Sequence, residues 1–168
     1  MMSETRTMSD LTFLNDDTRY HLPLTSHPNL HWIYTALVTI GPIEEVGQRP
    51  EGLQRIIPIT GGRFRGPRLQ GSIIPGGMDW NLHRTDGTSL VEASYFMRCD
   101  DGVVIKITNC GVNIRPLPDM PRLRPSFTTP VFAAPAGAYE FLNQGVFVGT
   151  LEPVPGESAV RIGVFQVG

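Results

Sequence analysis

Reactive side chains and long apolar runs are scarce in this sequence. Only 2 cysteines and 4 histidines are spread over 168 residues, and Lys106 is the single lysine. No apolar run approaches the roughly 20 residues that a membrane-spanning helix needs, and residues 1–10 lack the apolar centre of a signal peptide. We therefore expect a cytoplasmic protein that has no membrane partner.

The charges are nearly balanced, with 14 basic and 16 acidic side chains and a net charge of -2. A nucleic-acid-binding domain normally gathers a basic excess in one patch, whereas the arginines here are scattered along the chain. Nucleic acid is therefore not an expected partner. Because 40% of the residues are hydrophobic, the chain can form one core without a disulfide or a structural metal.

Motifs for common cofactors and metals are also missing. The sequence contains no Walker loop, no G-x-S-x-G, no G-x-G-x-x-G, no H-E-x-x-H and no C-x-x-C. His21, His27 and His31 lie close together in the chain, but they have neither a helical frame nor a cluster of neighbouring carboxylates. Solvated histidines are the simpler interpretation, so we expect no metal and no cofactor.

Turn-forming residues are abundant, with 18 glycines and 15 prolines, which favours many turns and few long helices. Short runs rich in Val, Ile, Thr and aromatic residues lie between the Gly and Pro clusters, a pattern typical of an antiparallel all-β sandwich or barrel. The eight predicted strands are residues 30–40, 54–60, 69–74, 78–84, 89–99, 103–110, 145–151 and 160–167.

The remaining segments complete the predicted organisation. Residues 1–28 are polar and aperiodic, which predicts a flexible N-terminal arm before a single domain at residues 29–168. A short helix is expected from Pro135 to Leu142, with an end signal at Asn143. The four prolines of residues 111–126 predict a long loop.

Two tight turns set the expected register of the central strands. Asp86-Gly87 is typical of a two-residue hairpin, which would place Trp80 opposite Ala93. Asp100-Asp101-Gly102 fits a three-residue loop with glycine in the left-handed conformation, which would place Tyr95 opposite Ile107 and Ala93 opposite Asn109. Together the turns predict one interior face, whose members are Met78, Trp80, Leu82, Val91, Ala93, Tyr95, Met97, Cys99, Val103, Ile105, Ile107 and Asn109.

This interior face contains the candidate site. Trp80 is expected to stack on a flat or hydrophobic ligand, the Tyr95 hydroxyl to donate a proton or a hydrogen bond to a carbonyl, and Asn109 to help hold it. Met97 and Tyr34 are further candidate binding residues. The alternative is that Trp80 and Tyr95 are ordinary core aromatics, because a barrel of about eight strands is just wide enough either to fill itself or to hold one small ligand.

Asp79 is the candidate general base. Regular alternation would direct it away from Tyr95, toward solvent. A bulge at Gly76 or Gly77 would turn it into the interior, where it would complement the phenol of Tyr95. The two orientations remain open at this point.

A resemblance to a known family rests on residues 55–62, 64–71, 75–80, 127–132 and 139–143 and covers the chain from Leu30 onward. The family that these runs resemble occurs in bacteria and fungi and is domain-of-unknown-function family 3237. It implies a lipocalin-like antiparallel β-barrel without an established cofactor. Some fungal members belong to natural-product biosynthesis, where such barrels serve as cyclases, isomerases or lyases.

Two functions follow as hypotheses. The first is a cofactor-independent enzyme that carries out proton-transfer chemistry, as an isomerase, cyclase or lyase, on a hydrophobic carbonyl compound, with Tyr95 and Asp79 as catalytic residues. The second is a carrier that binds the same small hydrophobic molecule without reaction. Barrels of this size with open edges often pair, so a homodimer is also an expectation.

Overall fold

The structure, a computed structural model, describes residues 27–113 and 126–168. Most of the predicted N-terminal arm and of the predicted proline-rich loop lie outside the described residues. The described strands are β1 Leu30–Ile40, β2 Glu44–Arg49, β3 Gly52–Arg65, β4 Gln70–Arg84, β5 Ser89–Cys99, β6 Val104–Asn113, β7 Ser126–Ala133, β8 Val146–Pro153 and β9 Ala159–Val167.

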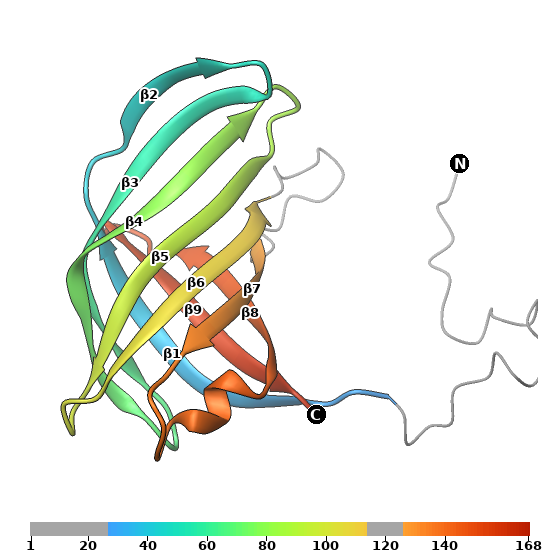
Figure 1. Ribbon diagram of the computed structural model, residues 1–168. Helices are drawn as coiled ribbons and strands as arrows, with labels where there is room; N and C mark the ends of the chain where they lie inside the picture. The colour runs from blue at the N-terminus through green and yellow to red at the C-terminus, as the bar shows by residue number, and fades with distance from the viewer. Residues whose placement is uncertain (1–26, 114–125) are drawn as a thin grey trace, which may run out of the picture.

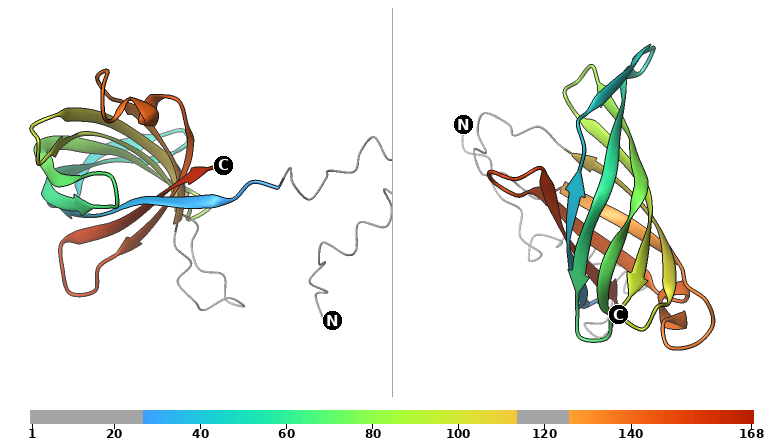
Figure 2. Two further views of the ribbon diagram at one scale, coloured as in Figure 1. Left: turned by 90° about the horizontal axis from the view of Figure 1, so that it is seen from below. Right: turned by 90° about the vertical axis from the view of Figure 1, so that its left-hand side faces the viewer.

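The described strands form a closed antiparallel barrel, which confirms the predicted fold (Figures 1 and 2). Strands β3 to β9 pair in chain order, and β1 closes the barrel by pairing with both β9 and β3. Strand β2 pairs with the outer edge of β3. None of the helices in the described part of the chain has the length and apolar character needed to cross a membrane.

The two ends of the barrel differ. At one end, named here the open end, the β2–β3 and β4–β5 hairpins project beyond the other strands at the top of Figure 1. At the other, the closed end, lie the β3–β4 and β5–β6 turns and the 3₁₀ turn η4 Glu140–Asn143. Tyr139, just before η4, donates a hydrogen bond from its hydroxyl to Asp101 in the β5–β6 turn (2.9 Å), which ties the elements of this end together.

Strand prediction was accurate where alternation is strong and wrong where it is weak. Strands β1 and β5 begin and end at the predicted residues, whereas predicted strands 69–74 and 78–84 form the single strand β4. Strands β2 and β7 were not predicted. β2 was missed because its residues are mostly polar. β7 was missed because it follows the proline run and contains Pro130.

The predicted short helix is wrong, because only η4 forms there. Gly137 has a φ of +121°, which a right-handed helix excludes. The Asn143 side chain then accepts a hydrogen bond from the Ala134 N–H and donates one to the Ala134 carbonyl, both at 2.8 Å. These contacts hold the segment against the end of β7 in place of a continued helix.

The β5–β6 register is confirmed, with Tyr95 opposite Ile107 and Ala93 opposite Asn109. The predicted β4–β5 register is wrong by one residue, because Ala93 pairs with Asp79 instead of Trp80. The turn has three residues: the Arg84 N–H donates to the Thr88 carbonyl at 2.8 Å, and Gly87 is left-handed at φ 85°. A shift of one residue exchanges the two faces of β4.

The expected irregularity in β4 is present, although it is not what directs Asp79 inward. Between the pairs Ile74–Phe96 and Met78–Ser94, β4 has three residues and β5 has only Tyr95. β4 therefore has two residues more than β5 in this stretch. Because side chains alternate between the two faces of a strand, an even number of extra residues leaves the later residues of β4 on the same faces as before. Gly77 lies on the interior face opposite Ile59, and a Cβ at this position would collide with the Cβ of Tyr95.

Replacing Gly77 with alanine should therefore destabilise the barrel. A Cβ at Gly77 would overlap Tyr95 and would lie 2.9 Å from the Ser94 carbonyl oxygen. Overpacking of this kind costs about 1–3 kcal/mol. Urea unfolding of Gly77→Ala should show a free energy of unfolding reduced by that amount.

The matched control is Ser94→Ala on the exposed face of β5, opposite Met78. A surface change of this kind should leave the free energy of unfolding within about 0.5 kcal/mol of the original value. Equal stability of the Gly77→Ala and Ser94→Ala variants would contradict the close approach of β4 to Tyr95.

Candidate functional site

The interior is apolar and sealed toward the closed end. Edge-to-face aromatic contacts join Tyr34 to Phe64 (ring centroids 5.8 Å apart), Tyr34 to Phe132 (6.3 Å) and Phe132 to Phe147 (5.0 Å). Leu142 of η4 is buried beside this group. Apolar contacts of this density exclude water, so any polar group at the edge of the cluster experiences a low dielectric.

Solvent exposure of the inward-facing side chains increases toward the open end. Along β5, Met97 is fully buried, while Ala93 and Val91 retain a little exposure. Along β3, Ile59 is buried, whereas Ile57 and Arg55 are only half-buried. The interior therefore changes from a fully buried apolar half to a half whose side chains retain some solvent exposure.

Buried polar groups lie on the interior faces of four strands. Within residues 27–113 and 126–168, four buried polar atoms find no hydrogen-bond partner: Tyr34 Oη, Tyr95 Oη, Asn109 Oδ1 and Thr128 Oγ1. An unpaired buried polar group costs about 1–3 kcal/mol. Several such groups in one interior are typical of a site whose partners come from a ligand.

Strand pairing brings these groups together from four strands. Asn109 lies opposite Ala93, two residues from Tyr95 on the same face of β5. Thr128 lies opposite Gly149, Gly149 opposite Val164, and Val164 opposite Tyr34. Gly149 has no side chain to separate the members of this row, and the Thr128 hydroxyl occupies the space that a Cβ there would fill.

Burial raises the pKa of both phenols. Burial raises the pKa of Tyr95 far above its ordinary value, and burial together with the neighbouring Tyr95 does the same for the pKa of Tyr34. Both hydroxyls therefore remain protonated throughout the neutral range. They are available as hydrogen-bond donors or as proton donors to a bound molecule.

Asp79 supplies a carboxylate to the same interior. It lies opposite Ala93 on one side and Ile57 on the other, and its Oδ1 accepts a hydrogen bond from the backbone N–H of Glu92 at 2.9 Å. Burial raises the pKa of the Asp79 carboxyl, while the hydrogen bonds from Glu92 and Asn81 and the charge of Arg55 oppose that increase. Asp79 is thus a half-buried carboxylate with increased basicity, a property suited to a general base.

A chain of hydrogen bonds leads from Asp79 toward the open end. Asn81 donates from Nδ2 to Asp79 Oδ2 at 3.3 Å and accepts at Oδ1 from Nε (3.1 Å) and Nη2 of Arg55. Arg55 Nη2 also donates to Ser89 Oγ at 3.4 Å, and Ser89 Oγ lies 3.0 Å from His83 Nδ1. The chain connects β3, β4 and β5.

The predicted site residues are only partly brought together. Tyr34, Tyr95, Met97 and Asn109 all lie in the interior and are at most 2% exposed, and Asp79 faces the same interior. The interior position predicted for Trp80 is wrong: its side chain is 42% exposed on the outer face of β4. The extra residue in the β4–β5 turn is the physical reason.

Three residues of the site were missed at the level of sequence: Thr128, Arg55 and Asn81. Asn81 was left out of the predicted interior face by the same register error, and Thr128 belongs to β7, which was not predicted. If the β4–β5 turn had been predicted with three residues, as the β5–β6 turn was, Asp79 and Asn81 would have been placed in the barrel interior.

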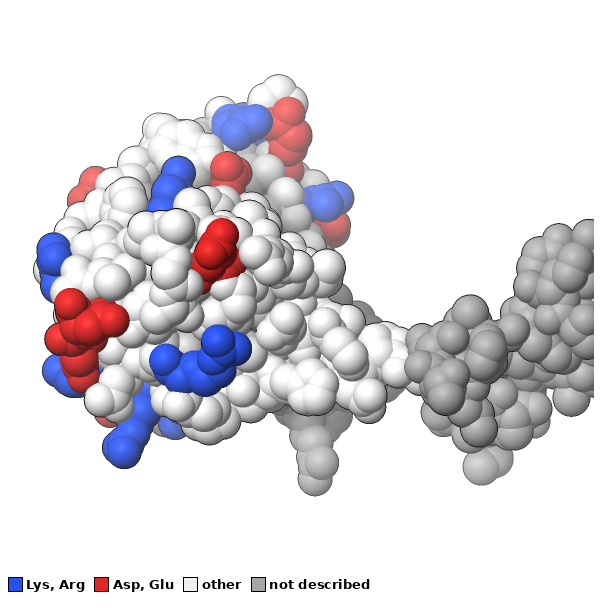
Figure 3. Space-filling model, turned by 60° about the horizontal axis from the view of Figure 1, so that its bottom comes forward, with Lys and Arg blue, Asp and Glu red and all other residues white. Residues whose placement is uncertain are grey.

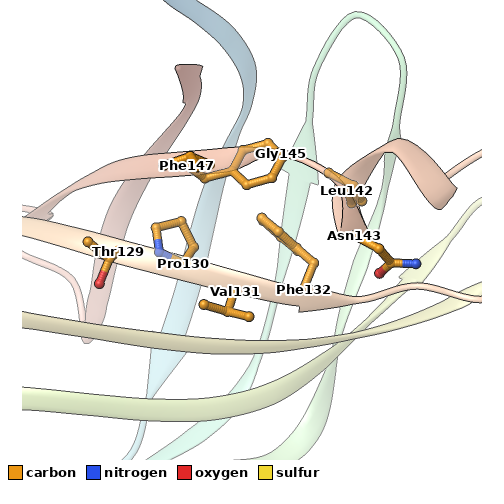
Figure 4. Close-up of a pocket in the computed structure, with 9 residues that line it drawn as sticks. Thr129, Pro130, Val131, Phe132, Leu142, Asn143, Gly145 and Phe147 are labelled. Atoms are coloured by element: carbon orange, nitrogen blue, oxygen red, sulfur yellow. The ribbon is translucent and has the colours of Figure 1, made fainter. Parts of the chain in front are cut away.

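A separate cleft opens in the barrel wall between β7 and β8. These strands pair only from Ser126 to Thr128 and then separate, which leaves a cleft of about 180 Å³. Figure 4 shows Phe132 of β7 and Phe147 of β8 reaching toward each other, with Leu142 and Asn143 of η4 at one end. None of the four unpaired polar side chains lines this cleft, so it is separate from the candidate site.

Surface charge does not indicate a polyelectrolyte partner on the face drawn in Figure 3, where basic and acidic side chains are interspersed. The part of the chain that the structure describes contains no group of three or more His, Cys, Asp or Glu side chains arranged to hold a metal ion. The chemistry that the described site offers is that of protonated phenols, a carboxylate, amides and a guanidinium.

Solved structures confirm the architecture. The chain resembles a conserved protein of unknown function from Rhodopseudomonas palustris with a TM-score of 0.75 and 28% identity, covering 84% of this chain and 99% of that one. A β-barrel-like protein from Acinetobacter baumannii matches with a TM-score of 0.75 and 27% identity over 89% of this chain and 99% of that one. An enzyme from Penicillium herquei shares the fold, with a TM-score of 0.69 at 24% identity over 88% of this chain and 98% of that one.

Sequence comparisons agree with the structural ones. A UPF0311 protein of Rhodopseudomonas palustris is 30% identical over 129 residues, which are 71% of this chain and 84% of that protein. A hydroalkoxylation enzyme of Penicillium herquei is 32% identical over 81 residues, 48% of this chain and 54% of that enzyme. The family model described as "Protein of unknown function (DUF3237)" matches residues 28–167. The chain is therefore a member of the DUF3237 family.

Proposed function

We propose that this protein is a cofactor-independent enzyme that binds a small hydrophobic carbonyl compound inside the barrel and catalyses a proton-transfer reaction, most specifically the addition of a substrate hydroxyl across a carbon–carbon double bond. The observation that carries the proposal is the unpaired, fully buried phenol of Tyr95 on the same interior face as the half-buried carboxylate of Asp79. One group supplies an acid and the other a base.

The spacing of the two groups leaves room for a substrate between them. Ala93, the partner of Asp79, is two residues from Tyr95 on β5, a separation of about 7 Å along the strand. A small molecule held between them can lose a proton at one point and gain one at another. Asn109 and Tyr34 contribute polar contacts to the bound molecule, and Met97, two residues from Tyr95 on the same face of β5, contributes an apolar surface.

The addition balances without any further reactant. Asp79 accepts the proton of the substrate hydroxyl, and the oxygen forms a C–O bond to one carbon of the double bond. The π electrons then take the phenolic proton of Tyr95 at the other carbon. Return of the proton from Asp79 to the Tyr95 phenolate restores the enzyme, and the product is an isomer of the substrate.

The comparisons support this choice of reaction. The Penicillium herquei relative is named as a hydroalkoxylation enzyme, and hydroalkoxylation is the addition of a hydroxyl across a double bond. The relative shares about half of its length with this chain at 32% identity, which makes the same class of reaction a reasonable starting point for assays.

Replacing Tyr95 with phenylalanine should reduce turnover without loss of stability. Removal of a positioned acid lowers kcat by about a hundredfold or more. The hydroxyl has no partner among the described residues, so its loss should leave the unfolding temperature unchanged or increased. The assay is chromatography with mass detection on hydrophobic hydroxy-alkenyl carbonyl compounds, scored for conversion to an isomer of equal mass.

Tyr139→Phe is the matched control, because its hydroxyl bonds to Asp101 at the closed end. This variant should retain full turnover. Undiminished turnover by Tyr95→Phe would remove Tyr95 from the mechanism, and recovery of every test compound unchanged by the original protein would favour the carrier function instead.

The pH dependence of kcat/KM should reflect the ionisation of the Asp79 carboxyl. The base acts in its deprotonated form, and burial raises its pKa, so kcat/KM should increase with pH through an ionisation above the ordinary pKa of an aspartate. The pKa of Tyr95 is raised in turn, so the profile should then remain level into the alkaline range. Asp79→Asn should remove the acidic limb and lower kcat/KM by about a hundredfold.

The control for Asp79 is Asp100→Asn in the exposed β5–β6 turn, which should leave the profile unchanged. An acidic limb that persists in Asp79→Asn with full activity would show that another group is the base.

A further inference from the structure

The outer face of strands β4 to β7 exposes a large amount of apolar surface. These strands lie side by side in the barrel wall (Figure 1). Half of the large hydrophobic side chains that are exposed in the described residues belong to this surface, which we name the apolar face: Met78, Trp80, Phe96, Val112, Phe127 and Val131. Monomeric proteins rarely expose contiguous apolar patches of more than a few hundred Å², so a surface of this kind indicates contact with another molecule.

Strand pairing makes the apolar face continuous. Its middle row crosses the four strands without a charge, and its members in strand order are Met78, Ser94, Thr108 and Val131. Trp80 lies one row from Met78 toward the open end, and Phe96 lies one row from Ser94 toward the closed end. The aromatic side chains therefore stand on both sides of an uncharged centre.

Two charged residues of opposite sign interrupt these three rows. Glu92 lies opposite Cys110 in the row toward the open end, and Lys106 lies opposite Phe96 in the row toward the closed end. The other outward residues of the three rows are uncharged. The two charges are four residues apart along the strand direction, about 13 Å, and within the described residues neither forms an ion pair.

The positions of these charges are complementary to a second copy of the same face. Glu92 and Lys106 lie on adjacent strands, at equal distances from the centre of the middle row and on opposite sides of it. A two-fold axis that lies in the face and runs nearly along the middle row brings Glu92 of one copy over Lys106 of the partner subunit, and the reverse. Two ion pairs then form, and the row of Trp80 meets the partner's row of Phe96.

From this geometry we propose that the apolar face is the interface of a symmetric homodimer, in which Glu92 of each copy pairs with Lys106 of the partner subunit. The closed barrel leaves β2 as the free strand edge among the described strands, and Glu44 and Glu45 on β2 disfavour pairing there. The surface for self-association is thus a face of the sheet and not an edge. This inference does not rest on the proposed function.

The exposed apolar area is close to what a stable dimer needs. Trp80, Phe96 and Phe127 are 42%, 47% and 65% exposed. Because an aromatic side chain has about 150–250 Å² of surface, the three expose roughly 300 Å² together. A standard interface buries about 800 Å² on each partner, of which about 57%, or about 450 Å², is apolar. The exposed parts of Met78 and Val131 add to the aromatic contribution.

Analytical ultracentrifugation of the full-length protein tests the interface. The original protein should have a mass twice the 18.5 kDa of one chain. Phe96→Glu places an unpaired charge within the face and should raise the dissociation constant of the dimer by at least about tenfold. Leu37→Glu on β1 is the matched control, because Leu37 is 48% exposed and lies outside the apolar face, and this variant should remain dimeric.

Reversal of the two charges tests the symmetry of the contact. Glu92→Lys alone and Lys106→Glu alone each bring like charges together across the two-fold axis, so each should raise the dissociation constant by at least about tenfold. The double variant exchanges the two signs and should restore the original dissociation constant. Pairing within one chain does not predict this restoration, because the two residues are too far apart for an ion pair.

A monomer at every concentration measured would overturn the proposal and leave the face to a partner of another kind. A dimer that persists unchanged in Phe96→Glu, or in both single reversals, would place the interface on another surface and also overturn it. Circular dichroism establishes that each variant is folded. These measurements do not involve turnover, so their outcome is separate from that of the Tyr95→Phe assay.

Discussion

The register between β4 and β5 is the constraint on which the site depends. The turn between them contains Thr85, Asp86 and Gly87, and Gly87 takes a left-handed conformation that most other residues disfavour. The Asp86 carboxylate accepts hydrogen bonds from both the backbone N–H (2.9 Å) and the hydroxyl (2.6 Å) of Thr88, which stabilises this loop length. A turn shorter by one residue would exchange Asp79 for Trp80 in the interior.

The interior combines two environments that have opposite effects on stability. The aromatic cluster around Tyr34 and Phe132 stabilises the closed end by burial of apolar surface. The unpaired hydroxyls next to it are unfavourable for the unliganded barrel. Groups that destabilise an empty site and are satisfied by a bound molecule are a recurrent property of functional sites.

The site was predictable where local pattern and turn chemistry agree. Tyr95, Met97 and Asn109 were placed correctly because the Asp-Asp-Gly turn sets the β5–β6 register and the apolar alternation supports it. Trp80 was misplaced because the end of β4 alternates in the opposite sense to its burial: the apolar Met78, Trp80 and Leu82 share one face, and the polar Asp79, Asn81 and His83 share the other. Alternation therefore favoured the wrong register, because the polar face is the one that lies inside.

The sequence by itself determined an all-β barrel, its strongest strands and the presence of a phenol, a carboxylate and an amide among them, because turn residues and two-residue alternation are local properties of the chain. The tertiary structure decided that Asp79 faces the interior, that Thr128 faces it from β7, and that Asn81 connects Arg55 to the Asp79 carboxylate. This arrangement depends on strand pairings between residues distant in sequence, and they form only when eight strands close around one interior.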